Sequence, residues 1–131
     1  AKERALSAGE IAPVLEALAA SLSHFDDDVR EDAVELLGII GRSVPDVEAV
    51  GPGGASIASL LVRALADPDA GVREEAAEAL GLLGKGAREA VTALERAALD
   101  PKKGVRKAAR EALWRIERDT AASPAVEIPR R

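Results

Sequence analysis

The sequence predicts an all-α protein, specifically a right-handed α-solenoid of three stacked helical hairpins. The first observation is an internal repeat, because a short pattern around an arginine occurs three times, at Arg30, Arg73 and Arg106. The second is that apolar residues follow each arginine at the spacing of an amphipathic helix. The third is a pair of Asp-Pro dipeptides, which interrupt helices. One hairpin cannot bury its apolar stripe alone, so the hairpins must stack.

Each repeat has two halves. The arginines are 43 and 33 residues apart, and the same offsets align Leu18 with Leu61 and Leu94 in an upstream segment. The expected units are 10–41, 55–84 and 88–118. We expect them to form a single repeat domain over 1–118. Residues 119–131 lose the periodicity and contain two prolines, which predicts an extended tail.

Six helices are expected from the periodicity and its breaks. In chain order they are 10–23, 28–41, 55–66, 71–84, 88–99 and 104–118. The apolar stripe of the second helix is formed by Val29, Ala33, Leu36, Leu37 and Ile40. Asp67-Pro68 and Asp100-Pro101 form the turns inside units two and three. The loop at 42–54 is rich in glycine and proline, which fits a tolerated insertion and a binding loop equally well.

Composition narrows the classes of partner. Hydrophobic residues make up 47% of the chain but aromatic residues only 2%, so the core must be built from Ala, Leu, Val and Ile. Charged residues reach 31% with a net charge of −5, which gives no general attraction to nucleic acid or to anionic membranes. Because cysteine is absent, disulfides and thiolate chemistry are excluded. No apolar run approaches the length of a membrane span, and the cytoplasm is the default compartment.

Three copies of Val-Arg-x-x-Ala-x-x-x-Leu, two of them preceded by Asp-Pro, resemble HEAT repeats of the short bacterial type, also called phycobilisome-lyase HEAT-like repeats. The resemblance covers roughly 10–118. Unit one departs from the pattern, because His24-Phe25 stands in the place of Asp-Pro. The resemblance implies protein binding along a concave face. Some members of the family serve as lyase subunits for tetrapyrrole attachment or as DNA-repair glycosylases, and the fold alone does not choose among these roles.

The repeated arginines have two interpretations. Arg30, Arg73 and Arg106 could form an anion-binding stripe, but a structural role is favoured. Asp67 and Asp100 each lie six residues before an arginine. As in HEAT-like arrays, we expect each turn aspartate to cap its second helix and to pair with an arginine of its own or the adjacent unit. The sequence therefore predicts an Asp–Arg ladder between repeats.

A mainly acidic row lies opposite the apolar stripe on the helical wheels of the second helices. The candidate partner-binding residues are Glu31, Glu35, Glu74, Glu78, Lys107, Glu111 and Trp114. The wheels also place Gly38 and Gly81 in this row, aligned with Trp114. Near the end of a helix, these glycines can also adopt a left-handed conformation or let a neighbouring backbone approach closely. A basic segment of a partner would suit the row, although an ordinary solvated face is the alternative. Trp114 either covers the end of the array together with the tail, which is the favoured reading, or anchors a partner.

The sequence contains no convincing catalytic constellation. His24 is the only histidine, and with Asp26, Asp27 and Asp28 it is better interpreted as part of a turn and helix cap than as a metal or acid–base site. A DNA glycosylase would need cationic and aromatic side chains on the inner face, which is mainly acidic. No metal, no cofactor and no catalytic residue is therefore expected.

The leading hypothesis is a non-catalytic protein–protein interaction or scaffold module that binds a protein or peptide of basic character, not nucleic acid or membrane. One alternative is a lyase-like subunit assisting tetrapyrrole attachment, which is motivated only by the resemblance. Another is a structural spacer in a longer array, which the absence of methionine favours. The sequence specifies neither the partner nor the oligomeric state.

Overall fold

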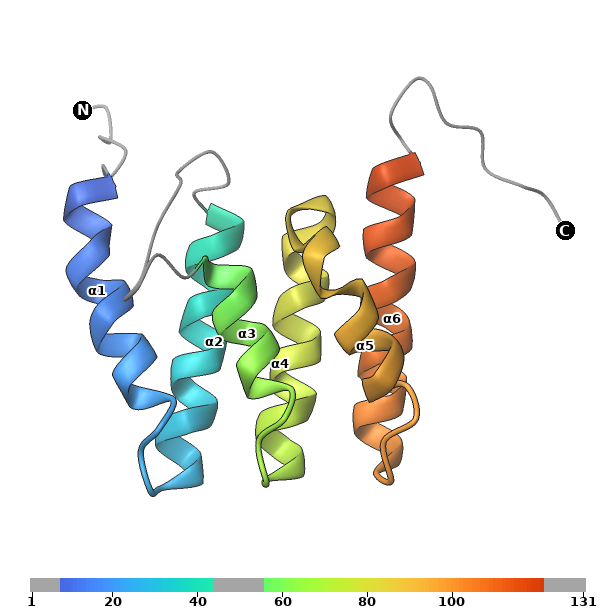
Figure 1. Ribbon diagram of the computed structural model, residues 1–131, viewed down its shortest axis with the longest axis horizontal. Coiled ribbons are helices and arrows are strands. Elements are labelled where there is room, and N and C mark those ends of the chain that lie inside the picture. The colour runs from blue at the N-terminus through green and yellow to red at the C-terminus, as the bar shows by residue number, and fades with distance from the viewer. Residues whose placement is uncertain (1–7, 44–55, 122–131) are drawn as a thin grey trace, which may run out of the picture.

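The computed structural model describes residues 8–43 and 56–121, and every regular element in these two ranges is a helix. In chain order the elements are α1 (Ala8–Ser21), α2 (Asp27–Ser43), α3 (Ile57–Ala64), α4 (Ala70–Leu83), the 3₁₀ helix η2 (Gly84–Ala90), α5 (Val91–Ala97) and α6 (Lys103–Ala121). The architecture is the predicted all-α solenoid of stacked hairpins (Figure 1). The predicted loop 42–54 lies mostly outside the described residues, as does most of the tail.

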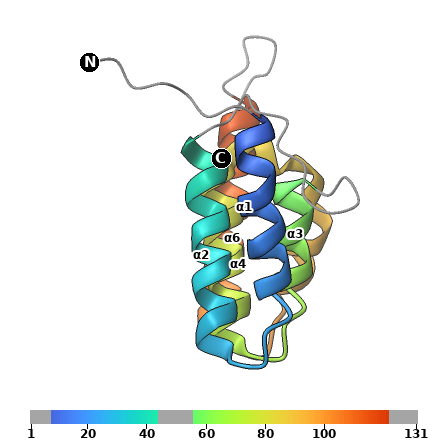
Figure 2. The ribbon, with the colours of Figure 1, turned by 90° about the vertical axis from the view of Figure 1, so that its left-hand side faces the viewer.

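The helices form two layers. The second helices of the hairpins, α2, α4 and α6, lie side by side in one layer, and α1, α3 and α5 cover it from the other (Figures 1 and 2). The middle second helix, α4, contacts both α2 and α6. Any surface shared by neighbouring hairpins is therefore built mainly from second helices.

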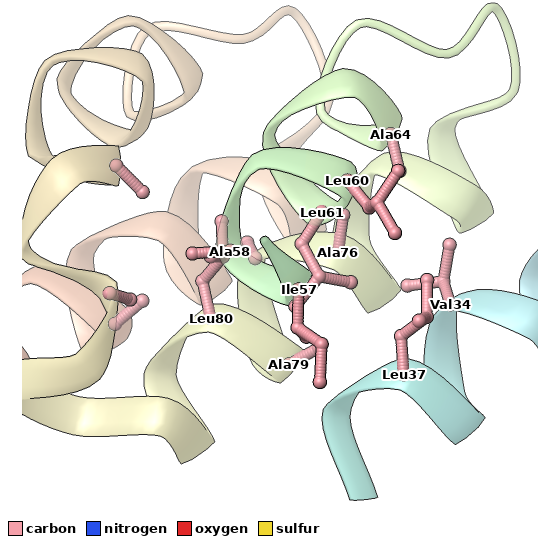
Figure 3. Packing of buried hydrophobic residues seen from close by; sticks show 14 of the residues in the cluster. Val34, Leu37, Ile57, Ala58, Leu60, Leu61, Ala64, Ala76, Ala79 and Leu80 are labelled. Carbon is pink, nitrogen blue, oxygen red and sulfur yellow. The ribbon is translucent and has the colours of Figure 1, made fainter. Parts of the chain in front are cut away.

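The core lies between the layers and consists of leucine, isoleucine, valine and alanine. Leu37 of α2, Leu61 of α3 and Leu80 of α4 are completely buried and belong to this core (Figure 3). Each such leucine stabilises the fold by about 1.5–3 kcal/mol relative to an exposed position. Leu36 was expected in the stripe of α2, but it is 47% exposed, and its neighbour Val34 is buried instead. The stripe therefore turns toward α4.

Neighbouring second helices approach closely at glycines. A Cβ atom built on Gly38 of α2 would lie 2.7 Å from the Cβ of Ala79 in α4. One on Gly81 of α4 would lie 3.2 Å from the Cα of Ala112 in α6. Both glycines are buried, so their placement on the open surface from the helical wheels was wrong. The wheel accounts for packing against the first helix of a hairpin but not for packing against the next second helix.

The third hairpin differs from the expected pattern at its first helix. Residues 88–99 were predicted to form one α-helix, but Gly84–Ala90 forms a 3₁₀ helix and α5 covers only Val91–Ala97. Gly84 ends α4 with a φ of 55°, a left-handed conformation that glycine adopts without strain. Ala87 and Ala90 are completely buried and fix the tighter segment against the core.

The last helix is longer than expected, because α6 reaches Ala121 whereas the sequence predicted an end at 118. Two contacts support the extra turn. Thr120 Oγ1 donates a hydrogen bond to the carbonyl of Ile116 at 2.9 Å. The backbone N–H of Lys85 donates to Asp119 Oδ2 at 3.2 Å, which ties the end of α6 to the end of α4.

Candidate functional site

The junction between the first two hairpins contains a bidentate ion pair. Arg30 of α2 donates from Nε to Asp67 Oδ2 at 2.9 Å and from Nη2 to Asp67 Oδ1 at 3.1 Å. Its Nη1 donates to the carbonyls of His24 and Phe25, at 2.8 and 3.2 Å, in the turn of its own hairpin. The hydrogen bond with Asp67 raises the pKa of Arg30. One arginine thus holds two successive turns.

The junction between the second and third hairpins repeats this geometry. Arg73 donates from Nε and Nη2 to Asp100 at 2.8 and 3.1 Å, and from Nη1 to the carbonyls of Asp67 and Pro68 at 2.8 and 3.1 Å. The arginine hydrogen bond lowers the pKa of Asp100, helped by the backbone N–H of Lys102. The Asp–Arg pairs therefore join adjacent units rather than residues within one unit.

The turn aspartates do not cap the second helices, contrary to the sequence prediction. The cap of α4 is Asp69, whose side chain accepts from the N–H of Val72 at 3.1 Å. Asp67 instead accepts from the N–H of Asp69 at 2.9 Å, and Asp100 likewise accepts from Lys102 at 2.9 Å. Each turn aspartate holds its own turn while it binds the preceding arginine, because the turn directs its carboxylate toward the neighbouring hairpin.

The expected acidic row is divided by the packing of the second helices. Glu31 and Glu74 are half-buried, and they face Gly71 and Gly104 at the start of the next second helix. Burial, together with the nearby charges of Asp28 and Asp69, raises the pKa of Glu31. Glu35, Glu78 and Glu111 are exposed. Only part of the row is thus freely accessible to a partner.

A groove lies between α4 and α6 and has a volume of about 230 Å³. Its acidic lining comes from Glu75 and Glu78 of α4 and Glu111 of α6, with Arg115 as the only cationic side chain among them. The remaining lining residues are Ala77, Gly81, Leu82, Ala108 and Ala112. Two of these small residues, Gly81 and Ala112, let the two helices approach closely.

Glu75 is the groove residue that sequence reasoning missed. Burial raises its pKa to about 7, and the negative charges of Glu78, Glu35, Glu31 and Glu74 add to this effect. Burial also raises the pKa of Glu78. The repeat alignment hid Glu75, because its equivalents Asp32 and Ala108 differ from it in size and charge. The available signal was the spacing Glu74-Glu75-x-x-Glu78, which gathers three carboxylates on one side of a helix.

Lys107 and Trp114 lie apart from this groove, on another side of α6. Lys107 is exposed and Trp114 is 56% exposed. The guanidinium of Arg118 lies over the Trp114 ring, 4.9 Å from its centroid. Trp114 occupies the repeat position of Gly38 and Gly81, which each contact the next second helix.

The residues around His24 act in the first turn. His24 Nδ1 accepts a hydrogen bond from the N–H of Asp26 at 3.0 Å, and the imidazole ring stacks on Phe25. Asp26 in turn accepts from the N–H of Asp28 at 2.9 Å. The carboxylates of Asp26, Asp27 and Asp28 approach within 4.8 Å of one another at the surface. These contacts are those of a turn and of a helix start.

Comparison with known proteins assigns the family. The sequence model of a protein family described as HEAT repeats matches residues 15–114. This range includes all three arginine motifs and both bidentate pairs. The fold and its ladder are those of a helical-repeat protein, and the chain belongs to the HEAT repeat family. A search of curated proteins finds no match to this chain. No helix in the described part of the chain is long and apolar enough to cross a membrane.

Proposed function

We propose that this protein is a non-catalytic interaction or scaffold module that binds a basic protein segment along its second helices. HEAT repeats commonly mediate protein–protein interaction, and the family is generally non-enzymatic. The observation that carries the proposal is the acidic groove between α4 and α6. It offers three carboxylates beside small apolar side chains, which suits an arginine or lysine with an aliphatic stem.

The groove carboxylates are available for a partner. Within residues 8–43 and 56–121, the ion pairs are Arg30–Asp67 and Arg73–Asp100, and neither involves Glu75, Glu78 or Glu111. Glu75 is half-buried among like charges, so a cation placed beside it relieves their repulsion. Glu31, Glu35 and Glu74 extend the acidic surface toward α2, whereas Lys107 and Trp114, which were also predicted to bind the partner, lie on another side of α6.

Binding of a basic segment should depend on pH. A cation favours the ionised form of Glu75, whose pKa in the free protein is about 7. We therefore expect the affinity for a basic peptide to rise as the pH increases from 6 to 8, because more of the free protein then carries the charge that the peptide recognises.

The test is a fluorescence anisotropy titration with a labelled peptide of alternating arginine and alanine, and with a matched peptide in which glutamine replaces arginine. The variant Glu75→Gln/Glu78→Gln should bind the arginine peptide about tenfold more weakly. A control variant, Glu89→Gln/Glu95→Gln, makes the same change of charge at exposed positions of η2 and α5. Equal weakening by both variants would contradict the proposal, because it would show attraction to net charge alone.

The finer assignments from the sequence stay predictions. These are the short bacterial lyase-type subtype, a lyase-like role in tetrapyrrole attachment, and a spacer role in a longer array. No observation on the described residues favours the lyase role. An absorbance change on mixing the protein with an open-chain tetrapyrrole would be the first sign of it.

A further inference from the structure

Each Asp–Arg pair is one rung of the ladder between hairpins. The outer side of α6 contains a third rung, at Arg106, for which the described residues supply no carboxylate. Arg106 donates from Nη1 to the carbonyls of Asp100 and Pro101 at 2.8 and 3.0 Å, as Arg30 and Arg73 do in their own turns. In those two arginines the Nε–Nη2 edge binds the aspartate of the following turn. Among the residues that the structure describes, no carboxylate binds this edge of Arg106.

The geometry points to a carboxylate as the missing partner. Two neighbouring rungs show what this edge of the guanidinium binds when its hydrogen bonds to the turn are in place, namely both oxygens of one aspartate. The Nη1 group of Arg106 is fixed by the carbonyls of its own turn. The Nε and Nη2 groups of the planar guanidinium then present two parallel N–H bonds, the arrangement that matches a carboxylate. The hydrogen bonds to the turn thus orient the guanidinium of Arg106 before a partner binds.

The side chains around this edge differ from those of the inner junctions. Within the array, three repeat positions hold Glu31, Val34 and Gly38 in α2, and Glu74, Ala77 and Gly81 in α4, and all six residues are buried or half-buried. The glutamate and the glycine of each set contact the next second helix. The same positions in α6 hold Lys107, Arg110 and Trp114. All three are exposed. In a chain with a net charge of −5, α6 thus has two cations and an aromatic ring where the inner second helices have an acid, a buried apolar residue and a glycine.

We propose that the outer face of α6, defined by Arg106, Lys107, Arg110 and Trp114, binds an acidic segment of a partner protein. One carboxylate of the segment occupies the Nε–Nη2 edge of Arg106, in the way that Asp67 and Asp100 occupy the inner rungs. Further carboxylates lie against Lys107 and Arg110, and an apolar side chain packs on the Trp114 ring, beside Arg118. This surface and this partner are separate from the acidic groove, so the two proposals stand or fall independently.

Two observations argue against a second copy of this chain as the partner. The first turn holds His24 in the place of Asp67 and Asp100. Its Nδ1 accepts from the N–H of Asp26, so the neutral ring carries its proton on Nε2 and offers a donor, not an acceptor, to an incoming arginine. In addition, Trp114 prevents a helix from approaching as closely as Ala79 approaches Gly38. The face therefore suits an extended segment better than another stacked hairpin.

Trp114 is the only tryptophan, so its fluorescence reports on this face directly. The full chain is titrated with a peptide of alternating aspartate and leucine, and with a matched asparagine peptide. The aspartate peptide should change the Trp114 emission saturably and the asparagine peptide should not. Arg106→Lys keeps the charge but loses the two parallel donors, and it should bind at least about tenfold more weakly. Arg88→Lys, at an exposed position of η2, is the matched control and should bind like the wild type.

Three results would overturn the proposal. The first is equal binding by the wild type and Arg106→Lys, provided that circular dichroism shows equal helicity. The second is a response to a single-stranded oligonucleotide without a response to the aspartate peptide, which would assign the face to phosphates. The third is concentration-dependent self-association that Trp114→Ala abolishes, with no response to peptide, which would assign the face to a second copy.

Discussion

The two inner junctions share the same ladder but differ in how closely their second helices approach. Arg30 and Arg73 bind their aspartates with nearly identical distances. In contrast, the contact of α2 with α4 at Gly38 is closer than that of α4 with α6 at Gly81, at 2.7 and 3.2 Å for a built Cβ atom. Both junctions place a half-buried glutamate against the start of the next second helix, Glu31 against α4 and Glu74 against α6. The second junction also contains the groove with Glu75. The repeat thus fixes the turns strictly and leaves the helix faces free to vary.

The largest expected effect comes from Leu80, which is completely buried in the helix common to both junctions. Leu80→Ala should lower the free energy of unfolding by about 3 kcal/mol through lost burial and an uncollapsed cavity. Urea unfolding followed by circular dichroism and by Trp114 fluorescence measures it. Coincident transitions would show that the junctions unfold together, whereas an earlier fluorescence transition would show that the third hairpin separates first.

The next effect concerns the ladder. Asp67→Ala and Asp100→Ala should each lower the free energy of unfolding measurably, because each leaves a partly buried arginine without its carboxylate. The side chains of these pairs are only 8–15% exposed. Similar losses measured by urea unfolding would show that the rungs are equivalent. A loss below a few tenths of a kcal/mol at either rung would contradict the structural role.

The stability that the Arg73–Asp100 pair contributes should decrease at low pH. The pKa of Asp100 is lowered in the folded state, so its contribution is complete above the unfolded value of 3.8 and is lost as the pH falls through the folded pKa. The stability difference between wild type and Asp100→Asn should therefore shrink below pH 4. Chemical denaturation at pH 7 and at pH 3 provides the comparison, and a constant difference would exclude the ion pair as its source.

Alanine substitutions at the two glycines compare the junctions directly. Gly38→Ala should destabilise the protein by about 1–2 kcal/mol, because the new methyl group meets the Cβ of Ala79. Gly81→Ala should be close to neutral, since the gain in helix propensity of about 1 kcal/mol offsets a milder contact. Thermal unfolding of both variants tests the order, and a less stable Gly81→Ala protein would reverse the comparison.

The effect expected at Glu75 depends on the pH. Its folded pKa of about 7 lies above the ordinary value of 4.5, so the fold favours the protonated form, and this contribution is lost as the pH rises through 7. Glu75→Gln should therefore be more stable than the wild type at pH 8, by about 1 kcal/mol after allowing for solvent screening of a partly exposed side chain. At pH 4 the two proteins should be alike. Parallel denaturation curves at the two values measure the difference.

Sequence reasoning predicted the parts of the molecule that repeat. The offsets between Arg30, Arg73 and Arg106 located the hairpins, and the six-residue spacing from Asp67 and Asp100 indicated the ladder. These features depend on local turn geometry, which the same residues produce each time. The caps were assigned to the wrong aspartates, because Asp67 and Asp69 are chemically alike and only the turn decides which one points at the helix.

The candidate site was harder to predict because it depends on contacts between units. A helical wheel has one buried side, whereas α4 packs against a first helix and two second helices. For this reason Gly38 and Gly81 were assigned to an open face, and Glu75 was overlooked. The short α5 was also missed, since only tertiary packing of Ala87 and Ala90 stabilises the 3₁₀ segment over a longer α-helix.

The position of the ladder has a mechanical consequence. Both bidentate pairs lie at the edge of the solenoid where the turns are, and each arginine clamps two successive turns. At the opposite edge, no bidentate pair is described, and the end of α4 is tied to α6 by packing of η2 and by a hydrogen bond from Lys85 to Asp119. Under tension or on binding, adjacent hairpins should therefore rotate about the edge that holds the turns, so that the distance between them increases at the opposite edge.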